Sequence, residues 1–341
     1  MEQKMMHRGR GKRAEEDAEE EMETINEKKT GPIKEVTDLP GIGPTTADKL
    51  GEAGYRTLMS IAASTPSEIR DKGDVGETVA RRAIIAARNA LNLGFESADA
   101  LLKKRQSLRR ISTGSKNLDA LVGGGFESGA ITETFGQYAS GKTQIAHVLA
   151  VRNFVEDLES YTFFIDTEST FRPERIVELC KNYGANPDEV LSHVKVARAF
   201  NSDHQMLLAD KIGEMIETQK IKVGVVIVDS LTGHFRAEFI GRGTLAERQQ
   251  KLNTHMHTLQ RLASTHNLCV YVTNQVMVRP DVFFGDPTEA IGGHIVAHAS
   301  TFRIYLRRGK KGSRVAKLVD SPNMPEAEAC FFVATDGLHD V

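Results

Sequence analysis

The chain has 341 residues, of which 40% are hydrophobic, and its 44 Lys and Arg nearly balance its 46 Asp and Glu. This length predicts two or more folding units, and the apolar fraction excludes a wholly disordered chain. No apolar run approaches the length of about 18 residues that a transmembrane helix needs, and the charged N-terminus lacks the apolar core of a secretory signal. The formal net charge of −2 excludes a globally basic surface, so nucleic-acid binding has to be local.

The three cysteines, Cys180, Cys269 and Cys330, are far apart in the sequence. Because no Cys-x-x-Cys pair is present, neither a zinc cage nor a disulfide framework is indicated. Together with the missing leader and membrane segments, this pattern predicts a soluble intracellular protein.

Residues 1–33 are highly charged and contain almost no large apolar side chain. A basic stretch at 8–13 precedes an acidic run at 15–23. Such a segment cannot bury enough apolar surface to offset the entropy of ordering, so it predicts a disordered tail. We favour a solvated tail, with contact between its basic end and nucleic acid as the alternative.

Residues 34–93 predict a small helical domain, because short helical patterns are broken there by Gly and Pro. The segment LPGIGPTTADKLGEAGY resembles a helix-hairpin-helix motif, and a weaker copy follows at 74–83. Gly41 and Gly43 permit a tight turn, and the next helix starts with free N–H groups that suit a DNA phosphate. The alternative is an ordinary helical hairpin, which Asp74, standing where the first copy has Gly41, favours for the second copy.

The rest of the chain predicts an α/β fold. Residues 94–110 form a polar linker interrupted by Phe95 and Ala98, and the core domain spans 111–341. Apolar strand-like runs alternate with helical stretches, which is typical of a mostly parallel sheet covered on both faces. After residue 300, shorter strands joined by turns predict an antiparallel extension. The expected strands are 161–166, 223–228 and 268–273, and the expected helices include 207–221 and 245–263.

The segment GQYASGKT matches the G-x-x-x-x-G-K-[ST] pattern of a phosphate-binding loop. It lies between a strand-like and a helix-like segment, as such a loop requires. We expect Lys142 to reach the β- and γ-phosphate oxygens and Thr143 to hold Mg²⁺ through its hydroxyl. The expected nucleotide-binding residues here are Gly136, Gln137, Tyr138, Ala139, Ser140, Gly141, Lys142, Thr143 and Gln144.

Polar side chains end three of the expected strands: Asp166 with Glu168, Asp229, and Gln275. The carboxyl ends of parallel strands gather at one edge of a sheet, so these groups should converge near the phosphates. We assign Glu168 as the general base because it projects beyond its strand, and Asp229 as the metal contact. The neutral Gln275 suits sensing of a γ-phosphate. A lone Asp at a strand end is otherwise more often a cap.

The motifs together resemble those of the RecA/Rad-type recombinase family, and most of all its archaeal RadA group. The similarity covers nearly everything but the tail. It implies a RecA-like ATPase core that binds ATP and Mg²⁺, behind a small all-α domain. It also implies a DNA-dependent ATPase of DNA repair and homologous recombination, which forms filaments on single-stranded DNA and catalyses pairing and strand exchange. The motifs are, in order, the helix-hairpin-helix, FESA, GQYASGKTQ, IDTESTFRPERI, VVIVDS, LAERQQKLNTHMHTLQRLA, TNQV and DSPNMPEAEA.

The resemblance also assigns residues outside the phosphate-binding loop. Phe95 and Ala98 would insert into the core of the next subunit and build the filament. Arg175 would stack on adenine. Asp320 and Pro322 would cap ATP bound to the adjacent protomer.

Two DNA-binding loops are implied, at about 236–248 and 276–292, and His298 would relay the nucleotide state to them. Flexible loops bearing Arg grip a DNA backbone regardless of its sequence, whereas the alternative for the first loop is an ordinary charged connection. Phe283 and Phe284 in the second loop either stack on bases or pack. The expected phosphate contacts of the first loop are Arg236, Arg242 and Arg248.

The basic cluster at 307–314 predicts a solvated hairpin tip, with a secondary DNA contact as the alternative. The chain departs from the family at three places: the family commonly has Glu, Gly and Gly where this sequence has Gln137, Ala139 and Ser169. Ala139 matters most, because a position that needs a positive φ would carry strain with a Cβ. We expect an effect on rate or affinity rather than on competence.

The motifs fit three functions to different degrees. A recombinase is favoured by the complete set of nucleotide-site residues, which argues against a DNA-binding filament or mediator protein without productive turnover. A ring-shaped hexameric helicase is disfavoured by FESA and the hairpin domain. The expected partners are single- and double-stranded DNA, further copies of the chain in a filament or ring, and possible recombination mediators. No membrane partner is expected, and the location is cytoplasmic with association to the nucleoid.

Overall fold

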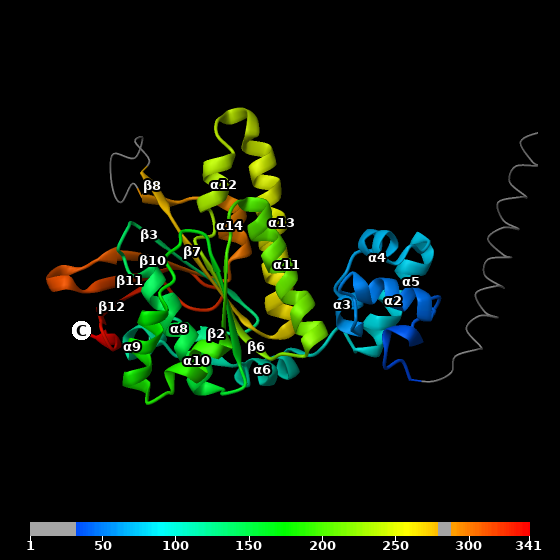
Figure 1. Ribbon diagram of the computed structural model, residues 1–341, viewed down its shortest axis with the longest axis horizontal. Coiled ribbons are helices and arrows are strands. Elements are labelled where there is room, and N and C mark those ends of the chain that lie inside the picture. Colours follow the sequence, from blue (N-terminus) through cyan, green and yellow to red (C-terminus); the bar gives the residue numbers. More distant parts are fainter. Residues whose placement is uncertain (1–31, 279–287) are drawn as a thin grey trace, which may run out of the picture. The chain divides into compact units, whose positions relative to one another are not determined.

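The computed structural model describes residues 32–278 and 288–341 (Figure 1). The predictions for the N-terminal tail up to residue 31 and for Phe283 and Phe284 lie outside the described residues. The chain divides into two compact units, one ending at Glu96 and one spanning Ser97–Val341. Each unit is described by itself.

The small unit is helical. Thr57 and Thr65 start two of its helices, since their hydroxyl oxygens accept hydrogen bonds from N–H groups in the first turn. A core of buried aliphatic side chains that includes Leu50, Ile61 and Ile69 holds the helices together. Its elements are η1 (Val36–Asp38), α2 (Pro44–Glu52), α3 (Leu58–Ala62), α4 (Pro66–Gly73) and α5 (Glu77–Ala90).

The two hairpin copies adopt the same turn-to-helix geometry. Gly43 and Gly76 precede α2 and α5, and each accepts the first helical hydrogen bond through its carbonyl oxygen. Gly41 has a φ of 77°, and a Cβ there would lie 2.8 Å from a methyl carbon of Val79 in the second copy. Glycine is therefore required at position 41 both for the turn and for the close packing of the two copies.

Within the described residues, the large unit is built on a nine-stranded sheet in the order β13-β12-β11-β10-β3-β7-β6-β4-β5. Neighbouring strands from β10 to β5 pair in parallel, and those from β10 to β13 pair antiparallel. The predicted α/β fold with an antiparallel C-terminal extension is confirmed. The strands are β3 (Ile131–Gly136), β4 (Tyr161–Asp166), β5 (Val194–Arg198), β6 (Val223–Asp229), β7 (Cys269–Asn274), β10 (Phe302–Arg308), β11 (Arg314–Asp320), β12 (Ala327–Ala334) and β13 (Gly337–Asp340).

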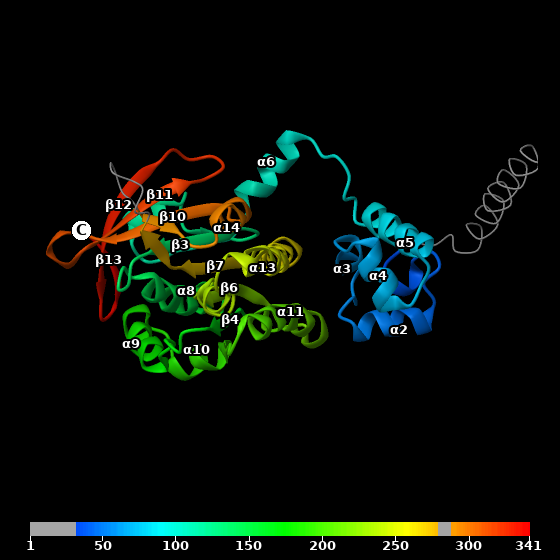
Figure 2. The ribbon, with the colours of Figure 1, turned by 90° about the horizontal axis from the view of Figure 1, so that it is seen from above.

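Helices cover both faces of the sheet (Figures 1 and 2). Successive residues of β6 supply alternate faces: Val225 and Ile227 belong to one apolar cluster, and Val226 and Val228 to the other. The first cluster packs under α8 (Lys142–Glu156), α9 (Pro173–Tyr183) and α10 (Pro187–His193). The second packs under α11 (Ser202–Gln219), α12 (Gly233–Glu238), α13 (Leu245–His266) and α14 (Gly293–Ala299).

The expected polar linker is partly helical, which corrects the sequence-based interpretation. Helix α6 (Ala98–Gln106) begins three positions after Phe95, whose side chain is exposed. Asp99 in the first turn and three basic residues in the last turn complement the helix dipole. A guanidinium nitrogen of Arg105 lies 3.1 Å from a carboxylate oxygen of Glu127, which holds the helix end against the large unit.

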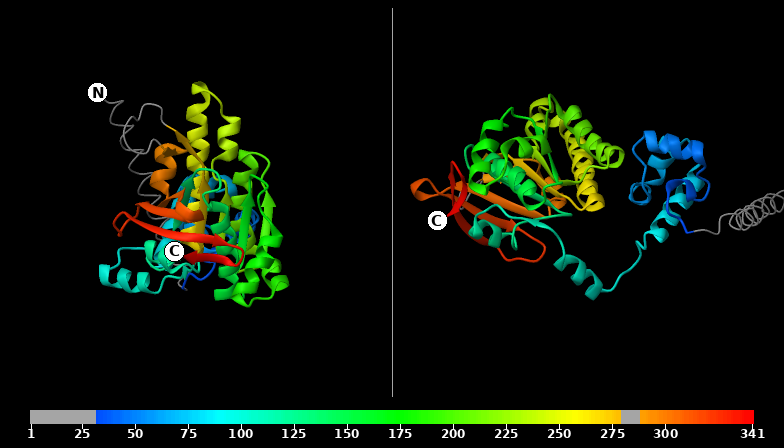
Figure 3. Two further views of the ribbon diagram at one scale, coloured as in Figure 1. Left: turned by 90° about the vertical axis from the view of Figure 1, so that its left-hand side faces the viewer. Right: turned by 60° about the horizontal axis from the view of Figure 1, so that its bottom comes forward.

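Short elements complete the large unit. The predicted hairpin at 307–314 is present, with its turn at η3 (Lys310–Gly312), and it extends past the neighbouring strands (Figure 3). Residues 32–278 and 288–341 contain no helix long and apolar enough to cross a bilayer. The remaining elements are β1 (Arg110–Ile111), α7 (Lys116–Leu121), β2 (Phe126–Glu127), η2 (Arg242–Thr244), β8 (Val276–Val278) and β9 (Thr288–Ala290).

Candidate nucleotide site and DNA interface

The phosphate-binding loop connects β3 to α8 at the carboxyl edge of the sheet. A cavity of about 610 Å³ opens over this loop, a size suited to a nucleotide. Gly136 cannot carry a side chain, since a Cβ there would lie 2.1 Å from the carbonyl oxygen of Leu306. The cavity is lined by Gly136, Gln137, Tyr138, Ala139, Ser140, Gly141, Lys142, Thr143, Gln144, Glu168, Thr170, Asp229, Ser230, Thr273, Gln275, Val276, Arg314 and Val333.

The Lys142 ammonium is held inside the loop. Its Nζ donates hydrogen bonds to the carbonyl oxygens of Gly136 at 2.8 Å and Gln137 at 3.0 Å. Burial lowers the pKa of Lys142, and the negative charges of Asp229 and Glu168 oppose that shift. A desolvated positive charge at the base of a cavity is suited to binding phosphate oxygens.

Asp229 is the buried carboxylate of the cavity, with 2% of its surface exposed. Burial raises its pKa, although hydrogen bonds from the hydroxyls of Thr273 and Thr143 act in the opposite direction. Thr170 also donates its hydroxyl to Asp229 at 3.3 Å. Because a Thr hydroxyl and a desolvated carboxylate meet here, the residues fit a divalent cation that prefers oxygen ligands, such as Mg²⁺.

Asp166 organises the loop that carries Glu168. Its carboxylate accepts hydrogen bonds from the backbone N–H groups of Glu168 at 3.2 Å, Thr170 at 3.1 Å and Phe171 at 3.1 Å. The exposed Glu168 carboxylate in turn accepts a hydrogen bond of 2.6 Å from the side-chain amide of Gln275. The strand-end residues that the sequence singles out therefore surround one cavity, with Asp166 behind the loop and Glu168 facing the cavity.

His147 ties the phosphate-binding segment to the Glu168 loop, and sequence reasoning missed it. Its Nδ1 lies 2.7 Å from the carbonyl oxygen of Thr143, and its Nε2 accepts the backbone N–H of Arg172 at 3.1 Å. The ring stacks on Phe171 with 5.3 Å between centroids. Burial lowers the pKa of His147, which favours the neutral ring that this pair of hydrogen bonds requires.

Six further cavity residues were not assigned to the nucleotide site from the sequence: Thr170, Ser230, Thr273, Val276, Arg314 and Val333. Thr273 had a usable signal, since it lies near the carboxyl end of β7, at the edge of the sheet where the other site residues were expected. Arg314 and Val333 enter the cavity only because the C-terminal strands extend the sheet next to β3, and no local pattern indicates that contact.

The residues assigned through the family resemblance lie away from the cavity lining. The Arg175 guanidinium donates to Gln144, at 2.9 Å, and to the carbonyl oxygens of Ala334 and Thr335. Asp320 ends β11, and the exposed Pro322 follows it, at positions that do not line the cavity of their own chain. The exposed His298 lies on α14, where its ring stacks with that of His294. Their roles on ATP remain predictions.

The first segment expected to bind DNA, at about 236–248, differs from the flexible loop that the sequence suggested. Arg236 is exposed on α12, Arg242 begins η2, and Arg248 lies in α13, so short helices present most of this segment. The Gly residues on both sides of Arg242 suggested flexibility, but α13 begins at Leu245 and includes the last part of the segment. The second segment is described at its two ends, β8 and β9, which pair antiparallel.

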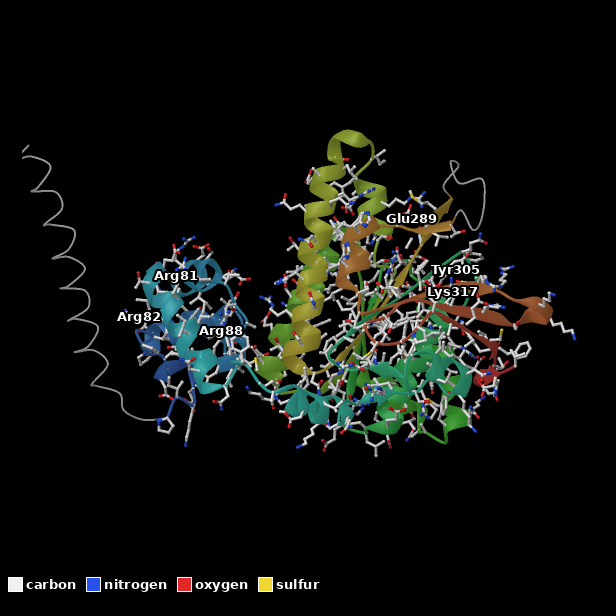
Figure 4. All side chains as sticks on the ribbon, turned by 180° about the vertical axis from the view of Figure 1, so that it is seen from behind. Arg81, Arg82, Arg88, Glu289, Tyr305 and Lys317 are labelled. Carbon is white, nitrogen blue, oxygen red and sulfur yellow. The ribbon has the colours of Figure 1, made fainter. Side chains whose placement is uncertain are left out.

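The small unit offers a helix start at its first hairpin. Gly43 precedes α2, whose first turn contains no acidic side chain, so its backbone N–H groups face no competing charge. In the second copy, Glu77 occupies the first turn of α5 and pairs with Arg81 at 2.6 Å. The second copy therefore disfavours a phosphate, and Arg81, Arg82 and Arg88 lie further along α5 (Figure 4).

The β10–β11 hairpin is basic, and two basic side chains on its strands are paired with carboxylates. Arg307 lies 3.0 Å from Glu328, and Lys317 lies 2.8 Å from Glu326. Tyr305 and Lys317 are direct neighbours across the two strands, as Figure 4 shows. These pairs are exposed, which is consistent with the solvated hairpin that the sequence predicts.

Replacing Ala139 by Gly should stabilise the phosphate-binding loop. Ala139 has a φ of 57°, a conformation that costs a residue with a Cβ about 1 kcal/mol. We expect Ala139→Gly to raise the melting temperature of the large unit and to tighten binding of a non-hydrolysable ATP analogue a few-fold. Ala120→Gly on the exposed side of α7 is the control, and it should lower stability by up to about 1 kcal/mol. Equal losses in both variants would contradict strain at Ala139.

Two family models match this chain. One, described as Rad51, matches residues 104–341, and the other, described as a SAM-like helix-hairpin-helix tandem, matches residues 33–89. The DNA repair and recombination protein RadA of Aeropyrum pernix is 49% identical over 312 residues, which cover 90% of this chain and 97% of that protein. The helix-hairpin-helix expectation and the α/β core are thus each matched by a separate model.

Proposed function

The chain belongs to the Rad51 family of DNA repair and recombination proteins, and from this membership and the site geometry we propose how it acts. It is a DNA-dependent ATPase of the recombinase type. We propose that it binds ATP and Mg²⁺ in the cavity over the phosphate-binding loop and assembles on single-stranded DNA. The filament then pairs that strand with a homologous duplex and exchanges strands.

One observation carries the link between DNA and hydrolysis. The side-chain amide of Gln275 donates a 2.6 Å hydrogen bond to Glu168, and Gln275 directly precedes β8, where the second DNA-binding segment begins. A movement of that segment on DNA therefore moves the group that contacts the proposed base. This position supports a nucleotide site whose turnover responds to DNA.

The chain's own residues then have defined roles. Lys142 and the N–H groups of the loop bind the phosphates, while Thr143 and Asp229 hold the cation. Glu168 orients the attacking water and accepts its proton. Bound Mg²⁺ supplies neutralisation of the charge on the phosphate oxygens. Release of ADP and phosphate would return the filament to a form that leaves DNA.

Self-association is supported by two exposed features. Phe95 is fully exposed, at 113% of its reference surface, which is unusual for a Phe with no role at the surface. Strand β5 lies at the edge of the sheet, and Val196, Phe200 and Leu207 are exposed on or near it. An open edge strand flanked by apolar side chains suits an extended segment from another copy, such as the one around Phe95.

Removing Arg236 and Arg242 should weaken binding to single-stranded DNA. Each phosphate contact contributes about 0.7 to the slope of log affinity against log salt, so the double Ala variant should lower this slope by about 1 to 1.5. Fluorescence anisotropy of labelled oligo(dT) measures both affinity and slope. Lys116→Ala with Lys181→Ala removes the same charge from α7 and α9 and is the control. An unchanged slope in the Arg variant would move the DNA site elsewhere.

Strand exchange tests the proposed function as a whole. The full chain is incubated with ATP, Mg²⁺, circular single-stranded DNA and a homologous linear duplex, and joint molecules are separated on a gel. We expect joint molecules and exchanged product only with ATP and only with homologous DNA. DNA-stimulated hydrolysis without exchange would leave the ATPase in place and overturn the strand-exchange activity.

A further inference from the structure

A charged residue lies buried in the sheet outside the nucleotide cavity. Glu133 on β3 has no exposed surface, and its carboxylate accepts hydrogen bonds of 2.7 Å from Arg303 on β10 and of 2.7 Å from Asn274 on β7. A buried ion pair of this kind adds little net stability compared with apolar side chains of the same volume. Stability alone therefore does not account for this cluster.

The amide of Asn274 joins this cluster to two distant segments. Its nitrogen also donates to the carbonyl oxygen of Ile291 at 2.6 Å, and its oxygen accepts the hydroxyl of Thr232 at 2.6 Å. Asn274 has no exposed surface, and Thr232 has 1%. All hydrogen-bonding groups of one buried amide are thus used, and two of the partners belong to neither the sheet nor the cavity.

Thr232 and Ile291 lie where the two proposed DNA-binding segments join the rest of the large unit. We call these two positions the segment roots. Thr232 directly precedes α12, which carries Arg236. Ile291 directly follows β9, the strand on which Figure 4 labels Glu289 and which returns the second segment to the core. The backbone repeats the arrangement, since the N–H of Leu231 donates to Thr273 at 2.8 Å and the N–H of Ile291 donates to Gln275 at 3.0 Å.

Three consecutive residues therefore contact the proposed metal ligand, the two segment roots and the proposed base, respectively. The hydroxyl of Thr273 donates to Asp229, Asn274 holds the two segment roots, and Gln275 donates to Glu168. Thr273 and Gln275 both line the nucleotide cavity, whereas Asn274 between them bonds to Thr232 and Ile291 at the two segment roots. A shift of either root moves the end of β7 and with it both contacts to the cavity.

We propose that Asn274 is a positioning residue through which DNA at the two segments controls ATP hydrolysis. Asn274 is fully buried and does not line the nucleotide cavity. It fixes both segment roots to the end of β7, directly before Gln275, so that binding of DNA to the segments sets the Gln275–Glu168 contact. This inference rests on the proposed function, because it takes the two segments as the DNA-binding ones.

Thr232→Val tests the proposal. The substitution keeps the shape of the side chain but removes the hydroxyl, which leaves the buried oxygen of Asn274 without its 2.6 Å partner. We expect DNA-free ATP turnover within about twofold of the parent chain, and turnover at saturating oligo(dT) about five- to thirtyfold lower, the effect of one buried hydrogen bond. Thr232→Ser keeps the hydroxyl and should retain most of the stimulation.

Thr162→Val is the matched control. Thr162 is also buried, on β4, and it also shares a side-chain hydrogen bond with an Asn, at 3.0 Å from Asn153, but it has no contact with the DNA-binding segments. Its stimulation by DNA should match that of the parent chain. If Thr232→Val does not fold by circular dichroism, Thr232→Ala replaces it in the same comparison.

The outcomes distinguish failure of the proposed function from failure of the proposed role of Asn274. A parent chain whose turnover does not respond to DNA would overturn the proposed function itself. A parent chain that responds, together with a Thr232→Val variant that responds as strongly as Thr162→Val, would overturn only the role of Asn274. So would a Thr232→Ser variant as impaired as Thr232→Val, since the effect would then come from the methyl group rather than from the hydrogen bond.

Discussion

Lys142→Ala should lower DNA-stimulated ATP turnover by at least about 100-fold, the scale expected when one preorganised charge at a developing negative centre is removed. The ammonium of Lys142 is desolvated, and a desolvated charge interacts with phosphate oxygens more strongly than one in water. The substitution also takes away the donor for the carbonyl oxygens of Gly136 and Gln137. The substitution therefore removes both the positive charge and the internal hydrogen bonds of the loop that binds the phosphates.

Release of inorganic phosphate at saturating oligo(dT) measures this turnover, and binding of a fluorescent ATP analogue separates affinity from chemistry. Lys116→Ala on α7 is the control for loss of a single positive charge and should leave turnover unchanged. The melting temperature of both variants shows whether the fold is kept. Near-normal turnover of a folded Lys142→Ala chain would mean that ATP is hydrolysed elsewhere.

The nucleotide site is largely predictable because its chemistry is local in sequence. The phosphate-binding loop is a contiguous segment, Asp229 ends a buried strand, and Glu168 and Gln275 closely follow two others. Once those strands are parallel neighbours, their carboxyl ends meet at one edge, so three separate segments converge without further information. The positive φ expected at Ala139 is confirmed for the same reason, since the conformation belongs to the loop and not to its surroundings.

The contacts that hold the site in place are not predictable in this way. In the sequence, His147 is one residue of an apolar helical stretch, and nothing there predicts that its ring bonds to the backbone of both Thr143 and Arg172. Asn274 ends β7 directly before Gln275, but its partners Thr232 and Ile291 are brought to it only by the packing of α12 and β9. Such side chains act through tertiary contacts between distant segments, which leave no periodic or motif signal in the sequence.

The helices around Arg236 and Arg248 and in the linker show a second limit of structure prediction from the sequence. Gly and Arg near 242 indicate a flexible loop, whereas α12 and α13 continue into that segment because their inner faces pack on the sheet through Phe235 and Leu252. Helix α6 is the opposite case, since it has no buried residue and depends on its end charges and on the Arg105–Glu127 pair. Tertiary packing overrides local preference in the first case, and local electrostatics decides in the second.

Phe95→Glu should convert filaments into small species. Each filament interface would lose an aromatic anchor and would have to bury a charge in an apolar pocket. A loss of about 4 kcal/mol or more per interface corresponds to an association constant about 1,000-fold lower, and a chain of such interfaces shortens accordingly. Multi-angle light scattering after gel filtration, with ATP and DNA present, should show monomers or short oligomers where the parent chain forms large particles.

The exposure of Phe95 makes this result specific to assembly. Because its side chain contacts solvent in the single chain, Phe95→Glu should leave the melting temperature unchanged, which separates loss of assembly from loss of folding. Leu93→Glu, two positions earlier and 48% exposed, places the same charge in the same segment and should keep the filaments. Phe200→Glu beside the open edge of β5 should reproduce the defect from the receiving side, since an interface fails when either of its faces is charged. Filaments of normal length in Phe95→Glu would refute the linker as the assembly segment, and intact filaments in Phe200→Glu would place the receiving surface away from β5.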